Sequence, residues 1–215
     1  MTSIFWHRRD LRLHDNAGLF KALKSGDKIQ PIFIFDSTIL SRLNVSDQRV
    51  LFIYQEIKQL KEKYAEYGSD LKVFHGNPVE LIPLIAHNLK ANAVYTNRDY
   101  EPYAIKRDKT LFELLKAQNC ELIGAKDHVI FEKNEVLKAD GLPYTVFTPY
   151  SRKWKEQLNY FYLKSYPVEK YCENLIHCAI EPLMTLENIG FNSRQFVEFP
   201  SIEIPIPTIE IYNTS

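Results

Sequence analysis

The first 125 residues alternate between short apolar runs and longer stretches in which apolar residues recur at helical spacing. Five of the short runs have the length of strands, and the second of them, residues 29–35, is almost continuously apolar. Such a run is typical of a strand that is buried on both faces of a sheet. The predicted strands span residues 3–7, 29–35, 71–75, 93–96 and 121–125.

Strands and helices in regular alternation build a parallel sheet with right-handed crossovers and with helices on both faces. The sequence therefore predicts an α/β fold, a doubly wound five-stranded parallel sheet of the Rossmann-like class. Asp15 and Ser46 are expected to cap the first two helices, and Gly68 is expected to end the second in a left-handed conformation. The helices are predicted over residues 16–24, 47–67, 78–89 and 103–118.

The composition changes near residue 140, because seven of the eleven prolines lie beyond it. One more amphipathic helix is predicted over residues 149–162, with Trp154, Leu158 and Tyr162 facing inward. From residue 166 on there is no strong periodicity, and the prolines exclude a central strand. We therefore expect a linker, or a segment that wraps across another domain. The predicted organisation is a domain over residues 1–162 and an interdomain linker over residues 163–215.

The charges of the chain balance, since Lys plus Arg and Asp plus Glu number 27 each. A protein devoted to gripping nucleic acid usually carries a basic excess, because neutralised phosphates supply most of the non-specific affinity. Any surface that meets DNA is therefore expected to be local or absent. The basic, aromatic group at residues 152–155 could contact nucleic acid, but a solvated helix face is the favoured interpretation.

Several common classes of protein find no support in the sequence. No stretch approaches the roughly 20 apolar residues of a membrane span, and the N-terminus does not have the pattern of a signal peptide. The three cysteines form no CxxC pair, which favours a reducing, cytoplasmic setting. Cys172, His177 and Cys178 match no structural zinc spacing. There is no GxGxxG, no GxxxxGK[ST] and no GxSxG motif, so neither catalytic residues nor a metal site is predicted.

Charged residues follow two of the predicted strands at the point where each strand ends. Ligands of open parallel sheets bind beyond these carboxyl ends. A solvated turn is the ordinary interpretation of one such loop, but two charged loops beside one crevice favour a polar ligand. Arg9 is expected to face the crevice, and Asp99 and Glu101 to point the same way from extended backbone. Arg12 and Asp15 are expected to tie the first loop to the sheet.

Four motifs follow one another in the order and at the spacing of a known family. They are WHRRDLRLHDN at residues 6–16, PIFIFD at 31–36, VYTNRDYEPYAIKRD at 94–108 and GLPYTVFTPYSRKW at 141–154. Together they resemble the N-terminal α/β domain of class I DNA photolyases and cryptochromes. The resemblance covers about residues 1–155, and it implies a domain that holds a light-harvesting antenna chromophore.

Antennas of this family are usually a deazaflavin, a flavin or a methenyl-folate. Resemblance to the deazaflavin-binding type implies a cofactor pocket made by Arg9, Phe33, Ile34, Arg49, Asp99, Tyr100 and Glu101. Folate-binding photolyases place an Asn-Glu pair where this chain has Tyr103 and Ala104, and a histidine near the position of Leu43. A deazaflavin or FMN is therefore favoured over methenyltetrahydrofolate, and an empty crevice is the remaining alternative.

Photolyases continue into a helical domain that binds FAD and accepts the flipped pyrimidine dimer. The resemblance implies that the whole protein is a deoxyribodipyrimidine photo-lyase acting on DNA, with its own FAD-binding domain as the partner of this chain. We expect the linker to be cut short and the chain alone to repair no DNA. A cryptochrome photoreceptor domain, a self-sufficient nucleotide- or flavin-binding α/β protein and a purely structural interaction domain are the alternatives.

Overall fold

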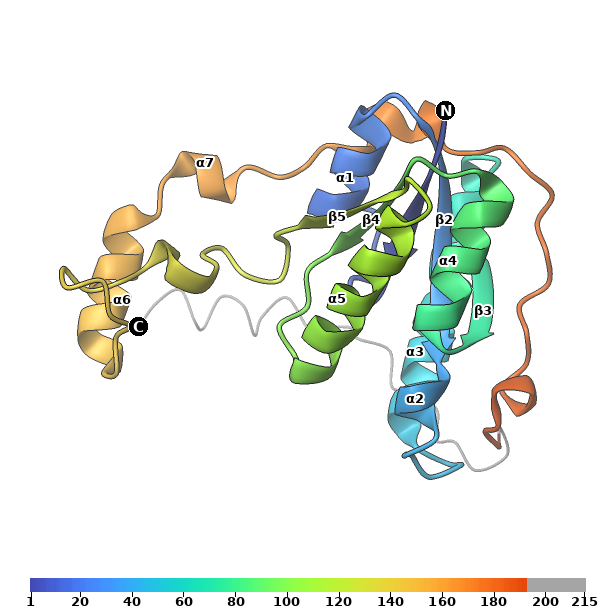
Figure 1. Cartoon of the computed structure of the whole chain (residues 1–215), viewed down its shortest axis with the longest axis horizontal. Helices are drawn as coiled ribbons and strands as arrows, with labels where there is room; N and C mark the ends of the chain where they lie inside the picture. The colour runs from blue at the N-terminus through green and yellow to red at the C-terminus, as the bar shows by residue number, and fades with distance from the viewer. Residues whose placement is uncertain (193–215) are drawn as a thin grey trace, which may run out of the picture.

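The computed structural model describes residues 1–192, and the last part of the predicted linker, residues 193–215, lies outside the described residues. Five parallel strands form one sheet in the order β3-β2-β1-β4-β5, which confirms the predicted fold (Figure 1). The strands are β1 (Thr2–His7), β2 (Lys28–Asp36), β3 (Lys72–Gly76), β4 (Ala93–Asn97) and β5 (Glu121–Ala125). Each of them lies within two residues of its predicted position.

Helices cover both faces of the sheet because alternate strand residues point to opposite faces. Phe5 and Phe33 pack on one face with α1 (Ala17–Lys24) and α3 (Gln48–Glu66), whereas Trp6 and Ile34 pack on the other with the remaining long helices. These are α4 (Pro78–Leu89) and α5 (Pro102–Lys116), and a short α2 (Ser37–Leu40) follows β2. No helix within residues 1–192 is long and apolar enough to cross a membrane.

The predicted caps of the first two long helices are each wrong by one residue. Asn16, not Asp15, caps α1, and its side chain accepts a hydrogen bond from the backbone N–H three residues later. Asp15 has φ of 48°, whereas a capping residue needs the extended backbone that Asn16 has. Asp47, not Ser46, caps α3, and its side chain accepts a hydrogen bond from the backbone N–H two residues later. Gly68 has φ of +68° just after α3, as predicted.

The helix predicted over residues 149–162 is two helices, so the prediction of one continuous helix is wrong. They are α6 (Phe147–Gln157) and α7 (Tyr160–Leu163), separated by Leu158 in extended conformation. Trp154 and Tyr162 contact the ring of Phe131 at centroid distances of 5.6 and 4.8 Å, but no residue of either helix is buried. Residues 126–163, which we call the arm, project from the α/β body (Figure 1).

Residues 164–192, which we call the strap, return from the arm and run along the α/β body (Figure 1). The strap includes two short 3-10 helices, Val168–Asn174 and Glu187–Ile189. Its apolar side chains complete the core beneath α1 and α3, and Leu175 forms an isolated bridge with Ile29 near the start of β2, before β2 pairs with β3. The buried strap residues are Val168, Cys172, Leu175, Leu186, Ile189 and Phe191. The described part of the segment predicted as a linker therefore packs on the α/β domain itself.

Candidate functional site

The strand order reverses between β1 and β4, which are neighbours in the sheet. Ligands of open α/β sheets bind beyond the carboxyl ends of the strands at such a point. A cavity of about 600 Å³ opens here, between the loops that follow β1, β2 and β4 and the first turns of α3 and α5. Sites for small molecules usually have volumes of about 300–1,000 Å³, so this cavity is large enough for a cofactor. We call it the edge cavity.

The structure brings together six of the seven residues that the sequence placed in a cofactor pocket. The residues that line the edge cavity are Arg9, Phe33, Ile34, Arg49, Asp99 and Glu101. Tyr100 does not line it, and instead lines a second cavity on the other side of the same loop. Side chains of successive residues in extended backbone point to opposite sides, which explains why Tyr100 is separated from its two neighbours.

The rim of the edge cavity carries an arginine between two carboxylates. Arg9 Nε lies 3.4 Å from Asp99 Oδ2, and Arg9 Nη2 lies 3.7 Å from Glu101 Oε1. The side chains of Arg9 and Glu101 are 59% and 58% exposed, whereas Asp99 is 11% exposed, and ion pairs with an exposed partner contribute little to stability. The three charged groups are therefore able to exchange their mutual contacts for contacts with a ligand.

The wall of the edge cavity beside α5 is a polar cluster that the sequence analysis did not assign. Tyr103 donates a hydrogen bond of 2.7 Å to Asp36 Oδ2, and Arg107 Nη1 lies 3.8 Å from the same oxygen. The guanidinium of Arg107 also stacks over the ring of Trp6 at 4.7 Å. Burial, and then the hydrogen bond to Asp36, raise the pKa of Tyr103, which therefore stays a neutral donor. The spacing of Tyr103 and Arg107, one helical turn, was the available signal.

Apolar side chains make the floor of the edge cavity. Phe33 and Ile34 come from the end of β2, and Val50 and Ile53 come from the first turns of α3. The rings of Phe33 and Phe35 meet edge to face at a centroid distance of 5.0 Å, which fixes the orientation of the floor. An apolar floor below a charged rim suits a planar ring whose faces are apolar and whose edge is polar.

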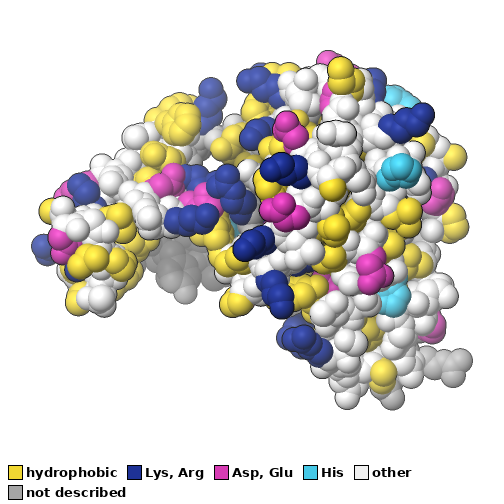
Figure 2. Space-filling view, viewed as in Figure 1, with side chains coloured by type: hydrophobic (Ala, Val, Ile, Leu, Met, Phe, Trp, Pro, Cys, Tyr) yellow, Lys and Arg dark blue, Asp and Glu magenta, His cyan; other side chains and the backbone are white. Residues whose placement is uncertain are grey.

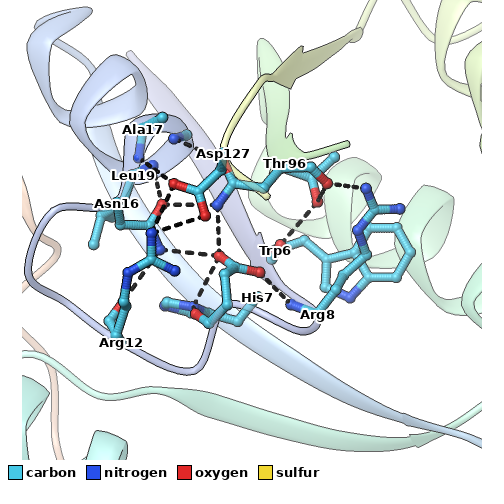
Figure 3. A network of polar contacts seen from close by, with 12 residues as sticks. Trp6, His7, Arg8, Arg12, Asn16, Ala17, Leu19, Thr96 and Asp127 are labelled. Atoms are coloured by element: carbon cyan, nitrogen blue, oxygen red, sulfur yellow. Dashed lines mark hydrogen bonds and ion pairs between the residues drawn. The ribbon is translucent and has the colours of Figure 1, made fainter. Parts of the chain in front are cut away.

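Behind the rim, a closed polar network holds the loop that follows β1 (Figure 3). The buried carboxylate of Asp10 accepts hydrogen bonds from the backbone N–H of Arg8 (3.0 Å), from Asn16 Nδ2 (2.9 Å) and from Asn97 Nδ2 (2.8 Å). Burial alone would raise the pKa of Asp10, but the hydrogen bond and charge of His7, together with these donors, lower it to about 2. Asp10 therefore has a structural role.

Arg12 and Asp15 have the expected structural role, but they hold the loop to the segments around the sheet and not to the sheet itself. Arg12 Nη2 donates hydrogen bonds to Asp15 O (2.8 Å) and to the carboxylate of Asp127 (2.9 Å), which also accepts from the backbone N–H of Ala17 at the start of α1 (Figure 3). Asp15 Oδ1 accepts from the backbone N–H of Tyr166 in the strap (2.8 Å). The loop is thus attached to α1, to the chain after β5 and to the strap.

Comparison with known proteins identifies the family of the chain. The family model described as DNA photolyase matches residues 3–170, which is most of the chain. The chain belongs to the DNA photolyase family.

Three members illustrate how much of such a protein the chain represents. The deoxyribodipyrimidine photo-lyase of Synechococcus sp. is 35% identical over 154 residues, which are 72% of this chain and 32% of that protein. The photolyase of Sulfolobus tokodaii, whose structure contains two FAD molecules, is 32% identical with a TM-score of 0.60 over 64% of this chain and 32% of its own. The class III photolyase of Agrobacterium tumefaciens shares the fold, with 22% identity and a TM-score of 0.73 over 88% of this chain and 38% of its own. The chain therefore spans about a third of the length of these photolyases.

The edge cavity of this photolyase domain has a polar rim and an apolar floor. Its donors and acceptors, Arg9, Asp99 and Glu101, stand on one side of an apolar floor. Arg42 and Arg49, both exposed, flank the mouth. These residues would hold a flat heteroaromatic ring at the rim and an anionic tail at the mouth.

Proposed function

We propose that this chain is the antenna domain of a DNA photolyase and that the edge cavity binds a flavin-like chromophore. The observation that carries the proposal is that six of the seven residues in the pocket implied by the resemblance, from four segments of the chain, line one cavity of about 600 Å³. When bound, such a chromophore absorbs blue light and passes the excitation energy to a second cofactor, so the protein has only to hold and orient it.

The residues of the edge cavity have two roles in holding the chromophore. Phe33, Ile34 and Val50 exclude water from the faces of the ring. Arg9 releases Asp99 and Glu101, and all three then pair with donors and acceptors along the edge of the ring. Because the loop that carries Arg9 is attached at several points, the ring is held in a fixed orientation.

Three positions in the edge cavity favour a flavin-like antenna over a folate. Tyr103, Ala104 and Leu43 line the cavity at the places where the folate-binding relatives are expected to carry an Asn-Glu pair and a histidine. Ala104 and Leu43 have no polar side-chain atom, and the hydroxyl of Tyr103 is already bonded to Asp36. The two FAD molecules in the photolyase of Sulfolobus tokodaii also support a flavin.

An absorption titration of the purified chain with 8-hydroxy-deazaflavin, FMN and methenyltetrahydrofolate tests the proposal. We expect saturable spectral shifts with the deazaflavin or FMN, and a weaker response to the folate. Arg9→Ala and Asp99→Ala should each weaken binding by about tenfold, as loss of a hydrogen bond to a charged group does. Lys24→Ala, on the far end of α1, is the matched surface control and should bind as the parent does. If both rim variants bind like the parent, the proposed site is wrong.

We further propose that light-driven repair of pyrimidine dimers belongs to the whole protein and needs its helical FAD-binding domain. The arm supports such a partner, because Phe147, Tyr160 and Phe161 are each 77–79% exposed. Large apolar side chains gathered on one projecting segment are typical of a surface that is covered in the assembled protein. Irradiating dimer-containing DNA with blue light in the presence of this chain and FAD should leave the dimers intact. Loss of dimers would contradict this part of the proposal.

A further inference from the structure

A second cavity, of about 310 Å³, lies between α5, the ends of β4 and β5, and the first part of the arm. We call it the inner cavity. Arg8 and Asp99 line both cavities and form the wall between them. Figure 2 shows charged side chains of both signs gathered where the arm meets the body. Neither the sequence motifs nor the proposed antenna site accounts for this cavity.

The inner cavity collects buried polar atoms that have no partner. Within residues 1–192, five buried side-chain nitrogen or oxygen atoms lack a hydrogen bond, and three of them belong to residues that line this cavity. They are Arg8 Nε, Tyr100 OH and Glu132 Oε1. Buried polar groups are nearly always paired in folded proteins. Three exceptions around one hollow therefore point to a ligand that completes them.

Other atoms of the Arg8 and Glu132 side chains already form hydrogen bonds, so only their unpaired atoms can bind a ligand. Arg8 Nη1 bonds the carboxylate of Asp108 at 2.7 and 2.9 Å, and the side chain of Arg8 is only 6% exposed. Glu132 Oε2 accepts from Arg98, and the side chain of Glu132 is 9% exposed. The unpaired atoms of Arg8 and Glu132 therefore offer one donor, Arg8 Nε–H, and one acceptor, Glu132 Oε1.

The hydroxyl of Tyr100 completes the polar side of the inner cavity. Burial, and then the charge of Glu132 and its side-chain contact with the hydroxyl, raise the pKa of Tyr100 to about 12. The phenol is therefore neutral, and because its contact with Glu132 is not a well-formed hydrogen bond, it is able to donate to or accept from a ligand. Ile105, Phe112 and Leu122 form the apolar walls. A polar edge between apolar walls, in about half the volume of the edge cavity, suits a ring system smaller than a flavin.

We propose that the inner cavity is a second binding site, for a small amino-substituted heteroaromatic ring such as a nucleobase. A ring nitrogen accepts from Arg8 Nε–H, the adjacent amino group donates to Glu132 Oε1, and Tyr100 bonds the same edge. Phe112 and Leu122 contact the faces of the ring. Binding here does not require an antenna in the edge cavity.

Isothermal titration of the whole chain with adenine tests this proposal, with purine as the probe that lacks the amino donor. We expect adenine to bind about three- to tenfold more tightly than purine, as one hydrogen bond to a buried partner implies. Tyr100→Phe should weaken adenine binding by a similar factor, because it removes only the hydroxyl. Adenosine, titrated in parallel, distinguishes a free base from a nucleoside as the source of the ring.

Ile105→Trp fills the inner cavity from its exposed wall and should abolish adenine binding. Leu114→Trp, the same change at an exposed position of α5 outside both cavities, is the matched control and should leave the affinity within about twofold. Circular dichroism of both variants verifies that they fold. Absence of adenine binding, equal binding of adenine and purine, or full binding by Ile105→Trp would each overturn the proposal.

Discussion

The loop after β1 has two sides that carry similar charged residues and have opposite properties. On the side of α1, Asp10 is 2% exposed and its donors lie at 2.8–3.0 Å. On the side of the edge cavity, Arg9 is 59% exposed and its partners lie at 3.4 and 3.7 Å. The first side is closed and fully paired, whereas the second is open and loosely paired.

This difference shows how one charged motif can serve both structure and binding. A buried charge has to be paired wherever it lies, so the network around Asp10 cannot give up a partner to a ligand. Water compensates an exposed charge, so Arg9 and Glu101 can change partners at little cost. Asp99 is only 11% exposed, so it can leave Arg9 only when a ligand donor takes the place of that arginine. The closed side holds the loop in place, and the open side is free to bind.

Asp10→Asn should have the largest effect on stability. The amide that replaces the carboxylate presents hydrogen atoms to donors already in place. We therefore expect a loss of about 3 kcal/mol in the free energy of unfolding, because buried donors lose a charged acceptor. Urea denaturation followed by circular dichroism measures this. A loss below about 0.5 kcal/mol, the usual size of a surface substitution, would show that the network is not the support of the loop.

The pH dependence of stability sharpens the same contrast. The pKa of Asp10 falls from 3.8 to about 2 on folding, so its carboxylate stabilises the folded chain by about 2 kcal/mol. This contribution is complete above pH 3.8 and disappears as the pH falls through about 2. Denaturation at a series of pH values should show this loss in the parent chain and lack it in Asp10→Asn. If the free energy of unfolding falls equally in both chains as the pH is lowered, Asp10 is not the source of the acid sensitivity.

Arg9→Ala should have the smallest effect on stability and a clear effect on binding. An exposed ion pair contributes about 0–1 kcal/mol, so the free energy of unfolding should change by less than about 0.5 kcal/mol. The same variant is expected to bind the chromophore about tenfold more weakly. A large loss of stability would place Arg9 on the structural side of the loop and remove the distinction between the two sides.

The fold was predictable because its signal is local. Five apolar runs separated by amphipathic helices predict a parallel sheet, and each observed strand lies within two residues of its prediction. The strap was not predictable in the same way. Leu175, Leu186 and Phe191 fill gaps in a core that other elements build, so their spacing follows no period of their own. The break at Leu158 was missed because the prediction used the spacing of apolar residues. No residue of the helix before the break is buried, so that spacing does not mark where the helix ends.

The candidate site was predictable only in part, for two physical reasons. Asp99 and Glu101 share a face of extended backbone, and the same period of two that groups them places Tyr100 on the opposite side. Arg107 and Trp6 come from a helix and a strand that meet only in the folded chain, where the guanidinium stacks on the indole ring. A contact of this kind between distant segments has no local pattern in the sequence.

The central claim is that the edge cavity itself receives the chromophore, and filling the cavity tests it most directly. Ile53 lines the floor and is half-buried, so Ile53→Trp adds bulk to the cavity without removing core packing. Leu84→Trp, at an exposed position of α4, is the matched control. The measurement is the dissociation constant of FMN by fluorescence titration. We expect the dissociation constant of FMN to rise at least about tenfold for Ile53→Trp, equal to about 1.4 kcal/mol, and to stay unchanged for Leu84→Trp. Equal FMN affinity in both variants and the parent would contradict binding in the edge cavity.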